Sequence, residues 1–198
     1  MAGLLITFEG VDGAGKSTQV ALLAEFLQQR GHETLSLREP GGTALGEALR
    51  QLLLERRELA LTPLGEFLLY AAARAQLMQD VVLPALAADK LVLLDRHVDS
   101  SLAYQGALGV DVDRIRSVNA WVTVGRHPDL TFLLDIEPAV AELRRQVAHG
   151  KLDRIENRDA AYHAQVRQVY RALAAAEPER FCVLDAAQSV DVVATAVR

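Results

Sequence analysis

The chain of 198 residues contains a single cysteine, so it cannot form an internal disulfide bond. Cys182 lies in an apolar run, which favours a core position over a reactive one. No cluster of residues resembles a zinc site. No run approaches the ~18 apolar residues that a membrane span requires, and the N-terminus lacks the pattern of a signal peptide. These absences predict a soluble, cytoplasmic protein that depends on neither disulfides nor a membrane anchor.

An excess of positive charge is also lacking, since the formal net charge is −5 at pH 7. This balance argues against a general nucleic-acid or membrane-surface binder, although a local basic patch could still hold phosphates. The sequence has no low-complexity linker and no internal repeat, and 51% of its residues are hydrophobic. Length and composition fit one domain with a sizeable core, which we expect to span residues 1–198.

Short apolar runs alternate with longer segments of helical periodicity. The runs are continuous, as in strands that are buried on both faces of a parallel sheet. We expect strands at residues 4–8, 34–37, 91–94, 131–135 and 181–184, and helices at about 16–29, 43–55, 63–88, 112–125, 138–148 and 158–175. This alternation predicts a three-layer α/β/α fold around a five-stranded parallel sheet.

A glycine-rich segment joins the first strand to the first helix, with the sequence Gly10-Val11-Asp12-Gly13-Ala14-Gly15-Lys16-Ser17. It matches the pattern of a phosphate-binding loop (P-loop), in which backbone N–H groups and a helix dipole face an anion. Lys16 is expected to reach the β- and γ-phosphates, and the Ser17 hydroxyl to bind Mg²⁺. The segment therefore predicts that the chain binds a nucleoside triphosphate.

Charged residues follow two further strands, at the edge of the sheet where ligands collect in such folds. Residues 38–43 follow the second strand, and Asp95 and Arg96 follow the third. Asp95 takes the position of an acidic Mg²⁺ partner, although a cap for the next turn would also explain it. Arg96 can grip a phosphoryl group with two N–H groups, although a surface ion pair is the ordinary alternative.

Two other patterns are ambiguous without further information. Tyr70 and Arg74 share a helix face, where they could stack on a base and bond its edge or serve as core packing beside a surface charge. A basic segment at about 144–157 could be a solvated helix face or a short helical lid over the triphosphate. Its basic residues are Arg144, Arg145, His149, Lys151 and Arg154.

Taken together, these residues resemble bacterial thymidylate kinases, P-loop enzymes that phosphorylate dTMP to dTDP with ATP. The resemblance runs nearly end to end and includes residues 8–18, 38–43, 68–76, 95–97, 99–106, 128–131 and 152–156. Its most diagnostic segments are Arg38-Glu39-Pro40-Gly41-Gly42-Thr43 and Ser100-Ser101-Leu102-Ala103-Tyr104-Gln105-Gly106. The resemblance implies a P-loop kinase fold, ATP and dTMP as small-molecule substrates, Mg²⁺, and a homodimer of helices packed side by side.

The resemblance also implies roles for individual residues. ATP would contact Gly10, Val11, Asp12, Gly13, Ala14, Gly15, Lys16, Ser17 and Thr18, with Mg²⁺ held by Ser17 and Asp95. The residues expected to bind dTMP are Asp12, Arg38, Glu39, Arg50, Tyr70, Arg74, Arg96, Ser101, Tyr104 and Gln105.

Within that set, Asp12 would hold the sugar 3′-hydroxyl, and Tyr104 would crowd a ribose 2′-hydroxyl. Arg38, Arg50 and Arg96 would surround the acceptor phosphate.

The catalytic group is expected to include Lys16 and Arg96. Some relatives carry an arginine at the position of Gly13, whereas this chain resembles those that supply the basic group from the lid. Lys151 and Arg154 are therefore the candidate lid cations.

Two alternatives remain. The chain could phosphorylate dCMP, dGMP or AMP, although Arg74 as a donor suits the O4 acceptor of thymine better than an amino group. It could instead be a GTP-dependent switch, although it lacks the Asn-Lys-x-Asp signature expected of one.

Overall fold

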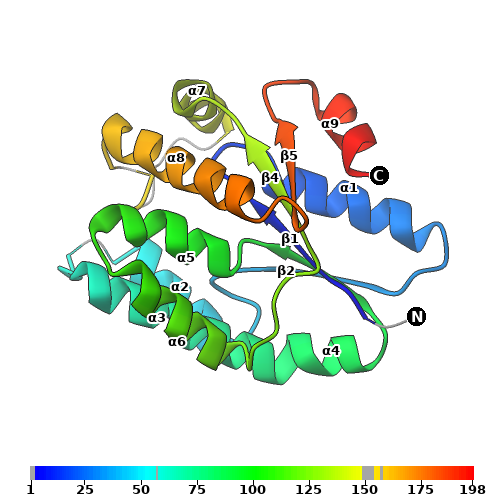
Figure 1. The fold of residues 1–198 in the computed structure, drawn as a ribbon, viewed down its shortest axis with the longest axis horizontal. Helices are drawn as coiled ribbons and strands as arrows, with labels where there is room; N and C mark the ends of the chain where they lie inside the picture. The colour runs from blue at the N-terminus through cyan, green and yellow to red at the C-terminus, as the bar shows by residue number, and fades with distance from the viewer. Residues whose placement is uncertain (1–2, 57, 149–153, 157) are drawn as a thin grey trace.

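The computed structural model describes residues 3–56, 58–148, 154–156 and 158–198. Five parallel strands form its central sheet (Figure 1): β1 (Leu5–Glu9), β2 (Thr34–Arg38), β3 (Leu91–Asp95), β4 (Leu130–Asp135) and β5 (Phe181–Asp185). Their order is β2-β3-β1-β4-β5, so β1 lies in the middle. Each strand agrees with its predicted range to within one residue at either end. The apolar runs of β1, β3 and β4 are buried on both faces of the sheet, whereas the edge strands β2 and β5 are only partly buried.

The helices are α1 (Lys16–Gln28), α2 (Ala44–Leu54), α3 (Pro63–Leu77), α4 (Leu83–Ala87), α5 (Val98–Tyr104), α6 (Val112–Val122), α7 (Pro138–Ala148), α8 (Ala160–Ala176) and α9 (Val190–Val197). α1 and α9 pack together on one side of the sheet, and α3, α4, α5 and α8 lie on the other (Figure 1). The predicted α/β fold with helices on both sides of a parallel sheet is therefore confirmed.

Three local predictions were incomplete. The helix expected at 63–88 is α3, a π-helical turn at Met78–Val82, and α4. Pro84 follows that turn and has no N–H to donate, which interrupts the regular bonding of an α-helix. The helices α5 and α9 were not predicted. α5 buries polar side chains such as Asp99 and Ser101 among its apolar ones, which weakens the helical pattern in the sequence. α9 is rich in β-branched residues, which suggest a strand.

The register of the sheet brings polar strand ends together. Phe8 of β1 and Arg38 of β2 both pair with Asp95 of β3. The carboxyl ends of these three strands therefore meet at one edge, directly beside the loop that begins after Glu9. The core beneath them includes Phe8 and Phe132, whose rings lie 5.1 Å apart. This edge carries the candidate site.

Candidate active site

Two adjoining cavities open at the carboxyl edge of the sheet. The first, called here the phosphate cavity, is lined by Asp12, Gly13, Gly15, Lys16, Ser17, Thr18, Arg38, Glu39, Arg50, Leu54, Glu55, Asp95, Arg96, Arg144, Arg145 and Glu156. The second, called here the base pocket, is lined by Asp12, Glu39, Pro40, Arg50, Leu54, Tyr70, Arg74, Arg96, Ser100, Ser101, Tyr104, Gln105 and Ile155. Nine of the ten residues expected to bind dTMP line the base pocket, and Arg38 lines the phosphate cavity. Shared walls, including Asp12 and Arg96, join the two cavities.

The loop between β1 and α1 has the backbone geometry of a phosphate cradle. Gly10, Gly13 and Gly15 have φ values of 136°, 86° and 97°, which L-residues with side chains rarely adopt. Gly15 directly precedes the first turn of α1, whose N–H groups carry the positive end of the helix dipole. Lys16 is buried and donates to the carbonyls of Gly10 and Val11 at 3.2 and 3.1 Å. Burial and the nearby Arg96 charge lower the pKa of Lys16.

Ser17 and Asp95 lie together at the mouth of the phosphate cavity. The Ser17 hydroxyl donates a hydrogen bond to Oδ2 of Asp95. A hydroxyl and a carboxylate are oxygen ligands that suit Mg²⁺. Within the described residues, no group of three or more His, Cys, Asp or Glu side chains could hold a metal alone. The two side chains therefore fit a Mg²⁺ ion that takes its remaining ligands from water and substrate phosphates.

Arg96 connects the loop, the base pocket and helix α5. Its backbone φ is 73°, an unfavourable conformation for a residue with a side chain. Nη2 donates to Asp12 at 2.6 Å and to the Tyr104 hydroxyl at 2.9 Å, while Nη1 donates to the Gly10 carbonyl at 3.0 Å. Although burial opposes ionisation of Asp12, the charges of Arg96 and Lys16 hold its pKa well below the ordinary value. A fixed cation and a fixed carboxylate thus face the space between the two cavities.

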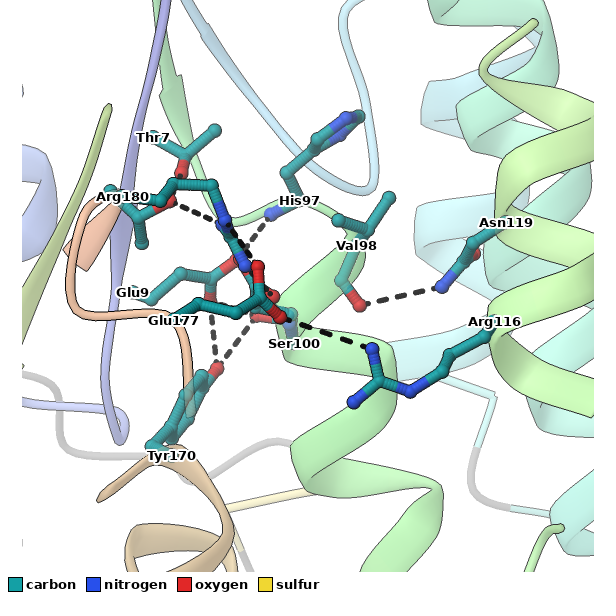
Figure 2. A network of polar contacts seen from close by, with 12 residues as sticks. Thr7, Glu9, His97, Val98, Ser100, Arg116, Asn119, Tyr170, Glu177 and Arg180 are labelled. Carbon is teal, nitrogen blue, oxygen red and sulfur yellow. Dashed lines mark hydrogen bonds and ion pairs between the residues drawn. The ribbon is translucent and has the colours of Figure 1, made fainter. Parts of the chain in front are cut away.

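Glu9 lies behind Arg96 and is completely buried. Its carboxylate accepts hydrogen bonds from the His97 N–H at 2.8 Å, the Ser100 hydroxyl at 2.6 Å and the Tyr170 hydroxyl at 2.8 Å. Figure 2 shows Ser100 and Tyr170 converging on it. Burial and the nearby Asp99 carboxylate raise the pKa of Glu9 to about 7, against the opposing effect of Arg96. The sequence did not single out Glu9, although a charged residue that ends a buried strand is a usable signal.

Arg74 is 2% exposed and forms the deep wall of the base pocket. Nε donates to Glu39 at 2.8 Å, Nη1 to Ser101 at 3.1 Å and Asn119 at 2.7 Å, and Nη2 to the His97 carbonyl at 2.9 Å. Its burial excludes the alternative of a surface charge. Asn119 comes from α6, and no motif predicted its contact with Arg74.

Further contacts fix the remaining walls of the base pocket. Gln105 donates to Glu66 of α3 at 2.9 Å, and Arg158 donates to the same carboxylate at 2.6 Å. The Tyr162 hydroxyl donates to the Tyr104 carbonyl at 3.0 Å. Helices α3, α5 and α8 are therefore held around the pocket by buried polar contacts.

A separate ion pair anchors the other side of α5. Arg180 donates to Asp99 at 2.7 and 3.0 Å and to the Thr131 hydroxyl at 2.7 Å. Figure 2 shows Arg180 beside Thr7 and Glu177. These residues fasten α5 to β4 and to the chain after α8, but they do not line the base pocket.

The basic segment at 144–157 is described only in part. Lys151 and His149, like Gly150, lie outside the described residues. Arg154 donates through its side chain to the Arg56 carbonyl and does not line either cavity. Arg144 and Arg145 of α7 line the phosphate cavity instead. A catalytic role for Lys151 or Arg154 stays a prediction.

The sequence and the fold were compared with known proteins. Residues 8–197 match the sequence profile of the family described as "Thymidylate kinase". A thymidylate kinase of Clavibacter sepedonicus is 49% identical over 199 residues, covering 100% of this chain and 94% of that protein. The thymidylate kinase of Deinococcus radiodurans is 50% identical over 190 residues, covering 96% and 91%.

The fold is also similar to that of a thymidylate kinase of known structure. The crystal structure of thymidylate kinase from Ehrlichia chaffeensis superposes with a TM-score of 0.82 at 30% identity, covering 100% of this chain and 97% of that one. No helix among the described residues is long and apolar enough to cross a membrane. Profile, relatives and structural neighbour agree over nearly the whole length, and the chain belongs to the thymidylate kinase family.

Proposed function

We propose that this chain transfers the γ-phosphoryl group of ATP to dTMP, giving dTDP and ADP. The observation that carries the proposal is the pair of cavities that share Asp12 and Arg96. One cavity is lined by the phosphate loop, and the other is a partly apolar pocket with a buried guanidinium in its wall. Two phosphorylated ligands bound there would meet at Arg96.

On the donor side, the loop N–H groups and Lys16 would bind the ATP phosphates, and Ser17 and Asp95 would hold Mg²⁺. Lys16 now donates to two carbonyls of its own loop, so it would exchange them for phosphate oxygens when ATP binds. Mg²⁺ would neutralise charge on the β- and γ-phosphates when bound.

On the acceptor side, Arg38, Arg50 and Arg96 would cancel the repulsion between two anions that must meet. The attacking atom is a phosphate oxygen, which is largely ionised near neutral pH because the second pKa of a phosphate ester is about 6. A strong general base is therefore not required. Positioning, charge neutralisation and exclusion of water would supply the catalysis.

Base selection would rest on Arg74 and Tyr70. The hydrogen bonds of Arg74 to Glu39 and Asn119 fix its guanidinium in one orientation. Nη2 carries two N–H groups, and its contacts among the described residues use one of them on the His97 carbonyl. The second can donate to O4 of thymine, whereas the amino group of cytosine or adenine would meet a donor with a donor. Tyr70 lines the same pocket and would lie along the ring.

Residues 144–157 are proposed to act as a lid over the triphosphate.

The chain is also proposed to act as a homodimer. Leu64 and Leu68 on α3 are 50% and 48% exposed, and Trp121 on the neighbouring α6 is 81% exposed. Large apolar side chains on adjacent helices favour a protein partner, and a second copy would bury them. A cytoplasmic location stays a prediction of the sequence.

The direct test measures ADP formation from ATP and Mg²⁺ with each nucleoside monophosphate offered singly at equal concentration. We expect fast turnover with dTMP, slower turnover with dUMP, and negligible turnover with CMP, AMP and GMP. Activity with another monophosphate would keep the phosphate site but discard the Arg74 assignment. A folded, ATP-binding protein without acceptor-dependent turnover would contradict the proposal.

Two variants test the charge-stabilising roles. Lys16→Ala and Arg96→Ala should each lower kcat by at least ~10²-fold, because each removes a cation aimed at the transferred charge. Circular dichroism would establish that each variant is folded. Near-normal turnover in either folded variant would remove that residue from the catalytic group.

A further inference from the structure

His97 directly follows Arg96 and is completely buried, but it lines neither the phosphate cavity nor the base pocket. Its backbone and its ring make contacts in three directions. The N–H donates to Glu9 at 2.8 Å, the carbonyl accepts from Arg74 at 2.9 Å, and Nδ1 of the ring lies 2.8 Å from Oε1 of Glu39. Figure 2 shows the N–H facing Glu9 and the ring pointing away from it. The proposed phosphoryl transfer assigns no role to this ring.

The hydrogen bond between His97 and Glu39 has only one possible direction. Although burial opposes ionisation of Glu39, the Arg74 charge and the His97 contact hold its pKa below the ordinary value. An ionised carboxylate can only accept hydrogen bonds, so Nδ1 of the ring carries the proton and donates it. At the other end of the ring, Nε2 is buried and has no hydrogen-bond partner among the described residues. The ring therefore acts through Nδ1.

Glu39 connects the His97 ring to Arg74. One carboxylate oxygen, Oε1, accepts from the ring, and the other, Oε2, accepts from Nε of Arg74 at 2.8 Å. Nη2 of the same guanidinium donates to the His97 carbonyl. The three residues thus form a closed circuit of hydrogen bonds, in which a carboxylate held at both oxygens fixes the plane of the guanidinium.

The backbone conformation of Arg96 directs neighbouring side chains to different parts of the site. Its φ of 73° bends the chain where β3 ends. The Arg96 side chain then reaches Asp12, whereas the ring of the next residue reaches Glu39. Two successive residues therefore contact the phosphate side and the base side of the site. A strained backbone conformation at such a point is typical of a functional constraint.

We propose that His97 is a positioning residue for base recognition, which acts through Glu39 to fix the orientation in which Arg74 donates to O4 of thymine. The inference rests on the proposed function, in which Arg74 reads the base. His97 itself lines neither cavity and is not expected to touch a substrate. Without the Nδ1 donor, Oε1 of the buried Glu39 loses its partner, and the carboxylate can turn together with the guanidinium that it holds.

Amide side chains at position 97 can separate the two ring nitrogens. Asparagine places its amide nitrogen where histidine has Nδ1, whereas glutamine extends its amide toward the place of Nε2. We expect His97→Leu to raise the KM for dTMP by at least ~10-fold, because a hydrogen bond to a charged group is lost. His97→Gln should resemble it, and His97→Asn should restore a KM near that of the wild type. The KM for ATP should change little, because Arg74 does not line the phosphate cavity.

A second arm tests whether His97 acts through Arg74. In an Arg74→Met background, His97→Leu should raise the KM for dTMP no further, whereas the effects of independent residues would multiply. A ring that serves only as core packing would lower Tm and would raise the KM by the same factor in both backgrounds. His127→Leu, at an exposed position outside both cavities, is the matched control for loss of a histidine.

The inference is overturned if His97→Leu keeps a KM for dTMP within about twofold of the wild type, since loss of a hydrogen bond to a charged group has a larger effect. Equal KM values in His97→Asn and His97→Gln also overturn it, and this pair decides alone if His97→Leu does not fold. An equal effect of His97→Leu with and without Arg74 assigns the ring a structural role instead. A wild type without dTMP-dependent turnover refutes the proposed function itself, and that result is seen before any variant is made.

Discussion

Glu9 couples the stability of this chain to pH near neutrality. Its pKa rises from the ordinary value of 4.5 to about 7 in the folded chain. Between these values the folded chain holds a proton that the unfolded chain has released, so the free energy of unfolding falls as pH rises. Urea unfolding at several pH values from about 5 to about 8 should show this slope in the wild type and a shallower one in Glu9→Gln. Identical slopes in the two proteins would contradict the assignment.

Arg74 is both a candidate base reader and a buried partner of Glu39. Arg74→Met should raise the KM for dTMP, because the proposed donor to O4 is lost. It should also reduce the free energy of unfolding by about 3–5 kcal/mol, because the Glu39 carboxylate is left buried without its cation. In the double variant Arg74→Met/Glu39→Gln, stability should recover in part while the KM stays high. An unchanged KM in Arg74→Met would remove Arg74 from the base pocket's recognition role.

The residues that could be predicted from the sequence are those in a local motif. Lys16, Ser17 and Asp95 follow from spacing along the loop and at a strand end. Asn119 and Tyr170 could not be predicted, because they reach the site from α6 and α8 through the packing of distant helices. Nothing in their local sequence distinguishes them from ordinary helix residues.

The phosphate loop packs against helix α7 so closely that no side chain fits at Gly13 without moving one of them. Gly13→Ala would add a Cβ 2.4 Å from the Ala141 carbonyl, at a φ of +86°. Gly31→Ala is a matched control, since Gly31 has a φ of +82° with nothing within 4 Å. The left-handed conformation alone should cost about 1–2 kcal/mol in each variant. We expect Gly13→Ala to lose more stability than Gly31→Ala, and also to lose turnover. If thermal unfolding showed the same loss of stability in both variants, close packing of α7 against the loop would be contradicted.

Helix α5 shows why one element escaped prediction while the sheet did not. The strands carry continuous apolar runs, a signal that burial on both faces requires. α5 instead directs polar side chains inward, with Ser101 toward the base pocket and Asp99 toward Arg180, and Gln105, just after the helix, also lines the pocket. No side chain at its own N-terminus caps it, and Glu9 of β1 accepts from its first N–H groups instead. Helices that build a polar site lack the periodicity by which helices are recognised.

A substitution at Trp121 tests the proposed homodimer directly. A lysine there should prevent a second copy from packing on α6, because a buried like charge would face its symmetry mate in a two-fold interface. We expect the wild type to sediment as a dimer and Trp121→Lys as a monomer in analytical ultracentrifugation. Val192→Lys, at a 53% exposed position on α9 across the sheet, should remain a dimer. A monomeric wild type would contradict the homodimer prediction.

The central place of β1 has a consequence for synthesis on the ribosome. Both neighbours of β1 come later in the chain, β3 at Leu91–Asp95 and β4 at Leu130–Asp135. A parallel strand has no hairpin partner, so a newly made β1 must wait for distant segments before it can pair. The loop after Glu9 therefore gains both supporting strands only after β4, which ends at Asp135, has been made. A nucleotide that binds the assembled site should therefore protect from proteolysis only chains that extend beyond β4.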